Sequence, residues 1–228
     1  ISALELRIFS ILGKHSMSAK QVARLAKTQL EGTEIILNAL SSMGALKKHH
    51  YKYKNTRITY KYFCASSLDY KKGTVMLKKE NREEYEQLSN IIKEGRDLQS
   101  YDVGDDSKFR HLFTYAMHER SELYAEKVAN IITKKPVGKL IDLGCGSGSY
   151  SLSILKLDKK ATAVLMDRPV ALKVAKNIHK DHPSHTRIKF IAGDLFKDHF
   201  GVKFNTVLLS NILHIYNPQE NKILFKKI

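Results

Sequence analysis

One stretch of the chain, residues 139–155, limits the possible folds more than any other. It opens with a short and mostly apolar run at 139–143, which is typical of a buried parallel strand. Three glycines follow at alternate positions, Gly144, Gly146 and Gly148, and a helical pattern comes after them. Glycine lets the backbone approach a ligand closely, and the first turn of a helix offers unpaired N–H donors. Strand, turn and helix together predict a nucleotide-binding loop, and a turn that binds nothing is the alternative.

The glycine spacing narrows the choice of nucleotide. A dinucleotide fingerprint would need a third glycine where Ser149 or Ser151 stands, and a phosphate-binding loop would end in Gly-Lys-Ser/Thr, which is not present. The sequence instead reads Asp-x-Gly-x-Gly-x-Gly, with Asp142 at the strand end. This pattern resembles motif I of the class I S-adenosylmethionine-dependent methyltransferases. The amino group of that cofactor suits a carboxylate and its carboxylate suits backbone N–H groups, so Asp142, Gly144 and Gly146 are candidates for cofactor binding.

The C-terminal part alternates strand and helix patterns. Strands are expected at 139–143, 162–166, 187–191 and 205–209. Helices between parallel strands imply an open, Rossmann-like α/β sheet whose ligands lie at the carboxyl ends of the strands. Asn217 is expected to cap a last helix that still continues at Ile228, which would leave the fourth strand at an edge. Because the sequence also does not begin with Met, we expect it to be a fragment of a longer protein, with the methyltransferase sheet truncated.

Two more acidic residues follow strands of this predicted sheet. Asp167 ends the second strand, where a carboxylate can accept both hydroxyls of a ribose. The alternative for Asp167 is a capping role before the helix that starts at Pro169. Asp194 follows the third strand, where it could take the amino group of an adenine while Leu195 and Phe196 cover the base. The alternative for Asp194 is an acid in a tight turn.

Residues 1–62 are predicted to form a small helical domain. One apolar helix is expected over 4–12, a second is capped by Ser18 with Gln21 at its third position, and a third runs over 33–43 and stops at Gly44. Alternation over 51–62 predicts a β-hairpin. The apolar side chains expected inside the second and third helices are Val22, Ala23, Leu25, Ala26, Ile35, Ile36, Leu37, Ala39 and Leu40. Three helices and a hairpin make a winged helix, which either reads DNA or mediates dimerisation, and we favour dimerisation because a methyltransferase-type loop follows.

Residues 63–135 are predicted to be mostly helical. A charged helix is expected over 78–93, with Tyr85, Leu88, Ile91 and Ile92 on its apolar side, followed by a linker or surface loop over 95–107. One long helix is expected over 108–132. The predicted domains are therefore a winged-helix domain at 1–62, a helical linker with substrate-pocket helices at 63–135, and a cofactor-binding domain at 136–228.

The segment after the fourth strand reads Ser210-Asn211-Ile212-Leu213-His214-Ile215-Tyr216. The whole arrangement now resembles the class I small-molecule O-methyltransferases with an N-terminal winged-helix dimerisation domain, the caffeate and acetylserotonin O-methyltransferase type. The Leu-His-Asp-Trp motif of that family appears here at 213–216, with Ile215 where plant members have Asp. The histidine of the motif is the general base in the family, so the resemblance puts that role on His214.

The resemblance also implies ligand contacts elsewhere. The Phe-x-x-x-Met element of the family matches Phe113 and Met117, which would line the substrate pocket. Ser121 would lie near the methionine end of the cofactor. Ser210 stands where plant members have a Lys that approaches the adenine, and Tyr216 stands where they have a Trp that stacks near it. Tyr216 can still stack on a base.

Elementary chemistry describes the reaction that such a site would perform. A sulfonium methyl group is already activated, so the protein must align a nucleophile with it. A phenolic hydroxyl has a pKa of about 10, and a neutral histidine, with an ordinary pKa of about 6.5, can take its proton as attack proceeds. No metal is needed, and no Cys or His spacing indicates a metal site. A histidine that is merely structural is the alternative for position 214.

The charge of the chain raises the question of an anionic partner. The 228 residues carry a formal net charge of +16, but lysines are spread through every segment. We therefore expect a small hydroxylated substrate and a second copy of the chain as partners, and no specific nucleic acid. The two cysteines do not make a disulfide framework, and no apolar run is long enough to span a membrane, so a cytoplasmic location is expected.

Two other functions remain alternatives. A nucleic-acid methyltransferase would typically place an Asn/Asp/Ser-Pro-Pro-aromatic motif after the fourth strand, where this chain has Ser-Asn-Ile-Leu at 210–213. A cofactor-sensing regulator would use its winged helix to bind DNA. Sequence-selective, salt-resistant binding in a gel-shift assay would favour the regulator, because lysines alone give weak and salt-sensitive binding.

Overall fold

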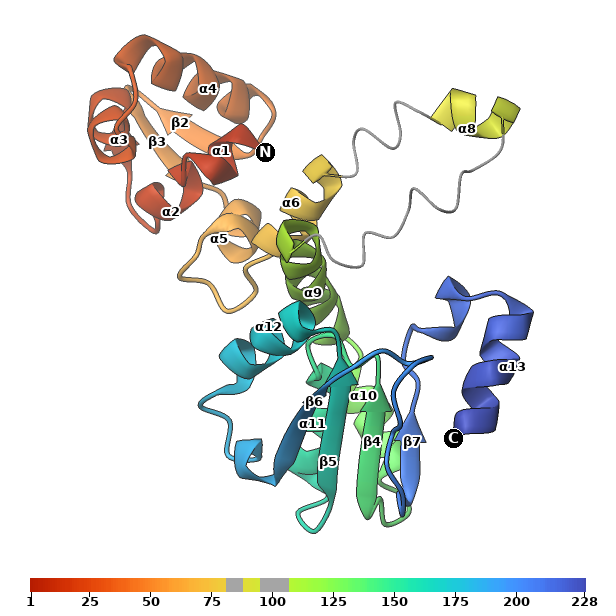
Figure 1. Cartoon of the computed structure of the whole chain (residues 1–228). Helices are drawn as coiled ribbons and strands as arrows, with labels where there is room; N and C mark the ends of the chain where they lie inside the picture. The colour runs from red at the N-terminus through yellow and green to blue at the C-terminus, as the bar shows by residue number, and fades with distance from the viewer. Residues whose placement is uncertain (81–87, 95–106) are drawn as a thin grey trace. The chain divides into compact units, whose positions relative to one another are not determined.

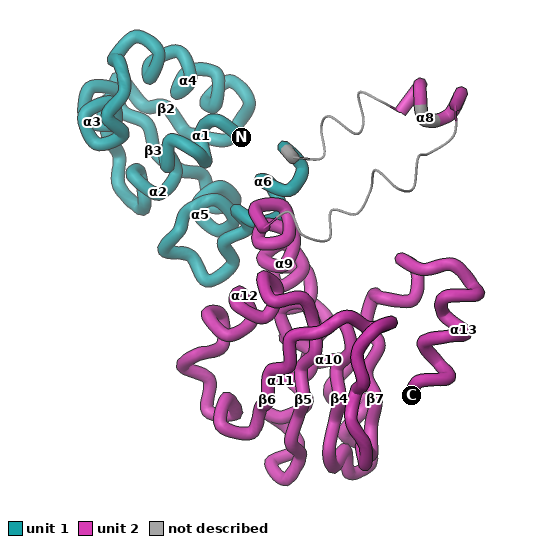
Figure 2. The backbone as a smooth tube through the Cα atoms, in the orientation of Figure 1, with its two compact units in different colours: residues 1–82 teal, residues 83–228 magenta. Residues whose placement is uncertain are grey.

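A computed structural model describes residues 1–80, 88–94 and 107–228. The chain divides into two compact units, Ile1–Arg82 and Glu83–Ile228 (Figures 1 and 2). No helix in the described part of the chain is both long enough and apolar enough to cross a membrane.

The first unit combines helices with a small three-stranded sheet. Its helices are α1 (Ser2–Glu5), α2 (Ile8–Leu12), α3 (Ala19–Ala26), α4 (Leu30–Ser42), α5 (Arg57–Phe63) and α6 (Lys72–Glu80), and its strands are β1 (Met17–Ser18), β2 (Leu46–His49) and β3 (Lys52–Asn55). The antiparallel sheet has the order β1-β3-β2. Ser18 and Gln21 form the predicted capping box at the start of α3, and Gly44, with a φ of 72°, follows the end of α4 as predicted.

The single apolar helix expected over 4–12 is wrong. The chain forms α1 and α2 instead, with Arg7 between them in the left-handed conformation at a φ of 56°. Apolar residues at 4, 6, 8, 9, 11 and 12 point around too much of a helix to be buried on one side. The break lets Leu4 and Phe9 enter one core, while Leu6 stays 38% exposed.

The hairpin expected over 51–62 is also wrong in position. Strands β2 and β3 pair from Leu46↔Asn55 to His49↔Lys52, so the hairpin lies five residues earlier than its predicted start. Residues after Thr56 form α5, because the Thr56 hydroxyl accepts a hydrogen bond from the Thr59 N–H and caps the helix. The alternation of Tyr, Lys and Ile over 57–62 therefore belongs to a short helix.

Helices α3 and α4 bury fewer side chains than their sequences predict. Val22, Ala23 and Leu37 are buried, whereas Leu25 is 51% and Ile35 is 64% exposed, and Ala39 is exposed too. Helix α4 begins three residues before the predicted start at 33 and contains Glu31 and Glu34 but no Lys or Arg. The second helix of this helix–turn–helix pair therefore lacks the cations that usually contact DNA phosphates.

The second unit begins with α8 (Leu88–Glu94), α9 (Ser107–Ser121) and α10 (Ala125–Ile132). Part of the charged helix expected over 78–93, namely 81–87 with Tyr85, lies outside the described residues. Residues 95–106 of the expected loop also lie outside them. Leu88 and Ile92, expected on the apolar side of that helix, are 49% and 74% exposed.

The long helix expected over 108–132 is broken between α9 and α10. The Ser121 hydroxyl donates a hydrogen bond to the His118 carbonyl oxygen at 2.8 Å. The N–H groups of Leu123 and Tyr124 donate to the carbonyl oxygens three residues earlier, those of Arg120 and Ser121. Back-bonding by serine and tight terminal turns both bend helices. The change of direction allows α9 to pack on α12 and α10 to pack on α11.

A four-stranded parallel sheet forms the centre of the second unit, as predicted. Its strands are β4 (Lys139–Leu143), β5 (Thr162–Asp167), β6 (Ile188–Ala192) and β7 (Thr206–Leu208), in the order β6-β5-β4-β7 (Figure 1). The helices α11 (Ser149–Leu157), α12 (Pro169–His179) and α13 (Pro218–Lys227) and the short η3 (His185–Arg187) and η4 (Leu213–Ile215) complete the unit. The chain order reverses at β4, because β5 and β7 lie on its two sides. Ligands of such sheets bind outside the carboxyl ends of the strands at that reversal.

Alternate residues of the central strands face two separate cores. Leu140 and Leu165 pack with Ile154 and Leu155 of α11 on one face, and Ile141 packs with groups that include Leu224 of α13 on the other. Asn217 and Glu220 form a capping box at the start of α13, as expected from the sequence. Both faces of the sheet are therefore covered, which fixes the end of β4 in place.

Candidate functional site

The glycine turn joins the end of β4 to the first residue of α11. Gly144, Gly146 and Gly148 all have positive φ, at 68°, 55° and 71°. A Cβ atom at Gly144 would lie 2.6 Å from Ile212 Cδ1, whereas a Cβ at Gly146 would meet no atom within 4 Å. The positive φ favours glycine at position 144, where a Cβ would also displace the end of the Ile212 side chain, and the backbone at Gly146 faces open space.

Asp142 is buried at the start of this turn and is only partly satisfied. The Ser151 hydroxyl donates to its Oδ2 at 2.6 Å. Its Oδ1 has no hydrogen-bond partner among the described residues. Burial, together with the nearby charge of Asp167, raises the pKa of Asp142 to about 7, against the hydrogen bond from Ser151.

Asp167 lies at the end of β5 and faces the same turn. Its Oδ2 accepts a hydrogen bond from the Gly146 N–H at 2.7 Å, and its Oδ1 accepts one from the Arg168 N–H, also at 2.7 Å. Burial raises the pKa of Asp167, while these two N–H groups and the charge of Arg110 oppose the shift. The two carboxylates thus flank the glycine turn from adjacent strands.

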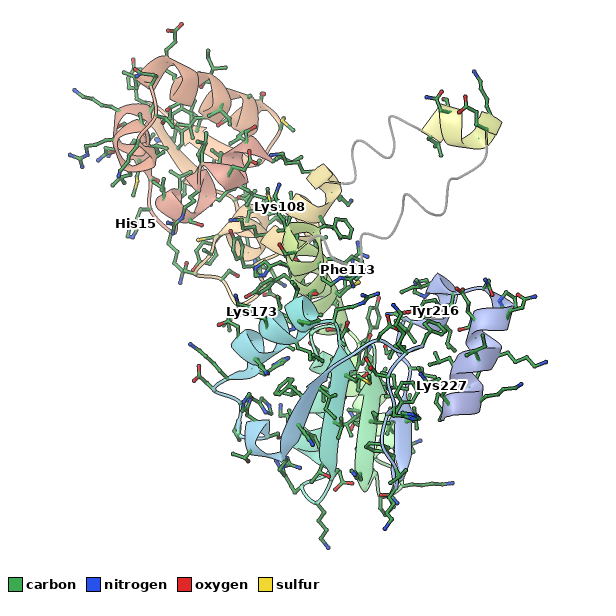
Figure 3. All side chains as sticks on the ribbon, viewed as in Figure 1. His15, Lys108, Phe113, Lys173, Tyr216 and Lys227 are labelled. Atoms are coloured by element: carbon green, nitrogen blue, oxygen red, sulfur yellow. The ribbon has the colours of Figure 1, made fainter. Side chains whose placement is uncertain are left out.

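A cavity of about 630 Å³ opens beside these groups. Its lining includes nine residues predicted from the sequence, namely Phe113, Met117, Ser121, Asp142, Gly144, Gly146, Asp167, Ser210 and His214. They come from α9, from the ends of β4 and β5, and from the segment after β7, and Phe113 projects from α9 (Figure 3). The structure therefore brings together polar groups at the strand ends and an apolar helix face.

His214 lies on the short helix η4, which the first turn of α13 supports. The Asn221 side chain donates to the Leu213 carbonyl at 2.8 Å and to the Tyr216 carbonyl at 3.2 Å. Asn217 caps α13 directly after η4. The His214 side chain is exposed and lines the cavity, so it can meet a ligand there.

Three other predicted residues are placed differently. Asp194, Leu195 and Tyr216 are not among the described residues that line this cavity. Asp194 accepts hydrogen bonds from the Phe196 and Lys197 N–H groups, and the bond from Phe196 is the main reason that its pKa is lowered. Leu195 is buried in the core. The Tyr216 ring (Figure 3) packs edge to face on the Phe196 ring, with the two ring centroids 4.8 Å apart.

The cavity also contains residues that the sequence analysis did not single out. Arg110 and Arg120 lie on α9, each three residues from Phe113 or Met117, and Tyr124 follows three residues after Ser121. These positions recur every three or four residues, so the helical period itself was the signal that could have identified them. Asn211, with a φ of 53°, and Ile212 line the cavity from the segment after β7.

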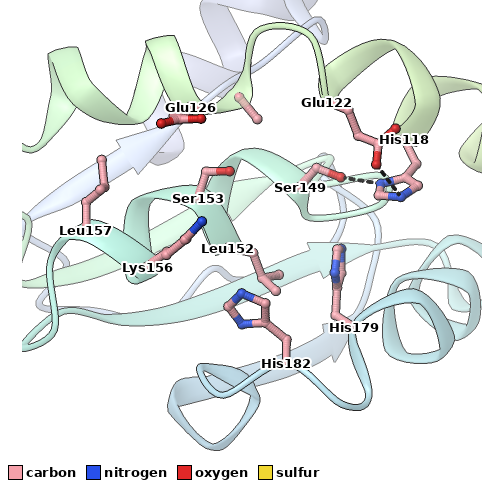
Figure 4. Close-up of a pocket in the computed structure, with 11 residues that line it drawn as sticks. His118, Glu122, Glu126, Ser149, Leu152, Ser153, Lys156, Leu157, His179 and His182 are labelled. Carbon is pink, nitrogen blue, oxygen red and sulfur yellow. Dashed lines mark hydrogen bonds and ion pairs between the residues drawn. The ribbon is translucent and has the colours of Figure 1, made fainter. Parts of the chain in front are cut away.

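A second, smaller cavity of about 360 Å³ lies within the same unit (Figure 4). His118, Glu122, Ser149 and His179 are among its lining residues. Within the described part of the chain, no group of three or more His, Cys, Asp or Glu side chains could hold a metal ion.

Comparison with known proteins identifies the family. A model of the O-methyltransferase domain matches residues 77–228, and a model of the O-methyltransferase dimerisation domain matches residues 1–63. The chain belongs to the O-methyltransferase family. Among curated members, a 3-hydroxy-5-methyl-1-naphthoate 3-O-methyltransferase of Streptomyces sahachiroi is 23% identical, with 97% of this chain and 66% of the relative covered. Acetylserotonin O-methyltransferase of Gallus gallus is 25% identical, with 100% of this chain and 70% of the relative covered.

Solved structures of family members share the fold. The structure of human N-acetylserotonin methyltransferase in complex with S-adenosylmethionine matches with a TM-score of 0.79 at 22% identity, covering 99% of this chain and 70% of that one. An O-methyltransferase family protein from Burkholderia thailandensis matches with a TM-score of 0.82 at 22% identity, covering 98% of this chain and 68% of that one. The chain spans 58% of the length of an uncharacterised Methanocaldococcus jannaschii relative, which is 25% identical over 95% of this chain.

Proposed function

We propose that this protein transfers a methyl group from S-adenosylmethionine to a hydroxyl group of a small molecule. The observation that supports this most strongly is the shared lining of the larger cavity. Asp142 and Asp167, which suit the cofactor, line the same cavity as His214, which suits a hydroxyl group that must lose a proton. The proposed substrate is an aromatic or polyketide-like compound, since Phe113 and Met117 contribute apolar surface to that cavity.

The residues at the glycine turn fit S-adenosylmethionine. The Oδ1 of the buried Asp142, which has no partner within the described part of the chain, needs a cationic or N–H donor, and the ammonium group of the cofactor supplies one. The open space beside Gly146 allows the cofactor to approach the backbone. Asp167 keeps lone pairs on both oxygens for the ribose hydroxyls.

Other cofactor contacts are part of the proposal. Ser121 would lie near the methionine end, and Ser210 near the adenine. Asp194, Leu195 and Tyr216 lie in the same unit but outside the lining of the cavity, so their contact with an adenine requires the base to extend beyond it.

The protein's part in the reaction is alignment and proton removal. When bound, S-adenosylmethionine supplies an activated methyl group. Phe113 and Met117 hold the apolar body of the substrate, and His214 takes the hydroxyl proton on an imidazole nitrogen as the oxygen becomes a nucleophile. Asp142 and Asp167 hold charge and hydroxyl groups at the strand ends and take no part in proton transfer.

A homodimer formed through the first unit is the second part of the proposal. The dimerisation-domain match at 1–63 and several exposed apolar side chains support it, including Leu25, Ile35 and Met43, at 51%, 64% and 79% exposure. Light scattering of the full-length protein at micromolar concentration should give the mass of a dimer. A monomer under those conditions contradicts this part.

Turnover by the full-length protein tests the proposed activity. The protein is incubated with S-adenosylmethionine and a panel of phenols, enols and hydroxylated polyketides, and products are followed by mass. A gain of one methylene unit, lost when the hydroxyl is blocked, is expected for at least one class. Methyl transfer to nucleic acid instead would contradict the proposal.

A further inference from the structure

The smaller cavity is lined by side chains of α9, α11 and α12, including His118 and Ser149, the residue that follows the glycine turn. Phe113, Met117 and Ser121 line the larger cavity, whereas His118 and Glu122 line the smaller one. Helix α9 therefore contributes side chains to both cavities, Phe113 and Met117 to the proposed substrate site and His118 to the smaller cavity.

His118 contacts the first residue of α11 directly. Its Nδ1 lies 2.8 Å from the Ser149 hydroxyl oxygen, which in turn lies 2.9 Å from the Ser147 hydroxyl oxygen (Figure 4 shows the first of these contacts). The opposite ring nitrogen, Nε2, lies 3.7 Å from Glu122 Oε1. A carboxylate on that side favours a proton on Nε2, so that Nδ1 accepts from Ser149 and Ser149 accepts from Ser147.

His179 of α12 holds the same turn from a second direction. Its Nε2 lies 2.8 Å from the Ser147 carbonyl oxygen, which can only accept, so Nε2 is the donor. Burial lowers the pKa of His179 to about 4, and the ring is therefore neutral near pH 7. The two imidazoles meet edge to face with centroids 5.7 Å apart. Side chains from two helices, His118 of α9 and His179 of α12, thus hold residues 147–149 in place.

We propose that His118 is a positioning residue: through its hydrogen bond with Ser149, it holds the glycine turn at a fixed position relative to helix α9, which lines the proposed substrate site. The proposal rests on the proposed function for the identity of the ligand. Ser149 begins α11, and the unpaired N–H groups in the first turn of a helix suit an anionic group such as the carboxylate of the cofactor. A bond from α9 to Ser149 therefore fixes the distance between those donors and the wall formed by Phe113 and Met117.

The test combines variants at both ends of the bond. His118→Ala and Ser149→Ala should each weaken S-adenosylmethionine binding about five- to tenfold, and the double variant should lose no more than either alone. His118→Asn should restore much of the affinity, because its amide oxygen can accept from Ser149. Ser153→Ala is the matched control, since Ser153 lines the same cavity one turn along α11, and it should bind as wild type. Additive losses, or an unrescued Asn variant, would overturn the proposal.

Hydrogen exchange separates this inference from the proposed function. In the cofactor-free protein, His118→Ala should speed amide exchange at 145–150 by at least fivefold, while the Ser153→Ala variant leaves it unchanged. If the wild-type protein does not bind S-adenosylmethionine, the proposed function fails, but the exchange result still decides the role of His118. Unchanged exchange in His118→Ala would show that the turn does not depend on this residue.

Discussion

Ser151 satisfies only one of the two oxygens of Asp142. The hydroxyl donates to Oδ2 at 2.6 Å, while Oδ1 has no hydrogen-bond partner among the described residues. Both side chains are buried, and burial raises the pKa of Asp142 to about 7. The carboxyl group is thus oriented by one bond and left open on the side that a cationic ligand would need.

Binding of S-adenosylmethionine should strengthen as pH rises through about 7, because its ammonium group needs the ionised form of Asp142. In the cofactor-free fold the raised pKa favours the protonated carboxyl group. Asp142 therefore contributes to the stability of the cofactor-free fold below about pH 4, and this contribution is lost as pH rises through about 7. Calorimetry from pH 5.5 to 8.5 should show affinity falling up to about tenfold per pH unit on the acid side.

Asp142→Asn is the control for that pH dependence. The variant should bind the cofactor weakly, and its affinity should depend little on pH, since the amide does not titrate. Without cofactor at pH 8, its Tm should rise by about 2–4 °C, the shift expected from about 1 kcal/mol in a chain of this size. If the affinity of this variant depends on pH as strongly as that of the wild type, a group other than Asp142 is responsible for the pH dependence.

Asp167→Ala should weaken S-adenosylmethionine binding by roughly 1.5–3 kcal/mol, through loss of charge-assisted hydrogen bonds. The variant also loses the 2.7 Å contact to the Gly146 N–H, so the turn is less well fixed. Asp181→Ala, which removes an exposed carboxylate, is the control for net charge. Equal calorimetric affinity in the wild-type and Asp167→Ala proteins would exclude Asp167 from the site.

The sequence was most informative where one local pattern determines both backbone and ligand. The strand that contains Asp142, the glycine turn and the capping box at Asn217 were all predictable, because glycine conformation and helix capping are local properties. The lining of the larger cavity by Phe113, Met117 and His214 came instead from a family resemblance.

Features that depend on tertiary packing were not predictable in the same way. Leu6 and Ile35 are apolar but exposed, because periodicity does not say which apolar face finds a partner. The bend at Ser121 depends on which helices α9 and α10 pack against. The contact between His118 and Ser149 joins residues 31 positions apart, so no local pattern indicates it.

Arg187 should contribute strongly to the stability of the second unit. Its guanidinium donates to the Ser184 hydroxyl and to the carbonyl oxygens of Leu155, Asp158, Lys159 and Ala161, at 2.6–3.2 Å. Arg187→Ala leaves the end of α11 without these donors and should lower the free energy of unfolding by roughly 2–3 kcal/mol in urea denaturation. Arg187→Lys should recover less than half, because an ammonium group cannot reproduce the planar fork, and full recovery would contradict this account.

His214→Gln should lower turnover roughly 10²- to 10⁴-fold, the usual contribution of a general base. Glutamine keeps a polar side chain of similar reach but cannot take a proton. Cofactor affinity should stay nearly unchanged, because His214 is not among the proposed cofactor ligands. Single-turnover rates with saturating S-adenosylmethionine are the measurement, and His199→Gln, at an exposed histidine, is the matched control.

The acidity of the substrate separates a base from a structural histidine at position 214. If His214 removes the proton, an acidic phenol that is already ionised at the assay pH should lose much less rate in His214→Gln than a weakly acidic phenol. If His214 is only structural, thermal stability and cofactor affinity should fall together, and all phenols should lose rate alike. Because η4 is held by Asn221 through the Leu213 and Tyr216 carbonyls, the His214 side chain can change without removing those bonds. Equal losses across phenols of different pKa in a well-folded variant would therefore leave substrate alignment, and not proton removal, as the contribution of this residue.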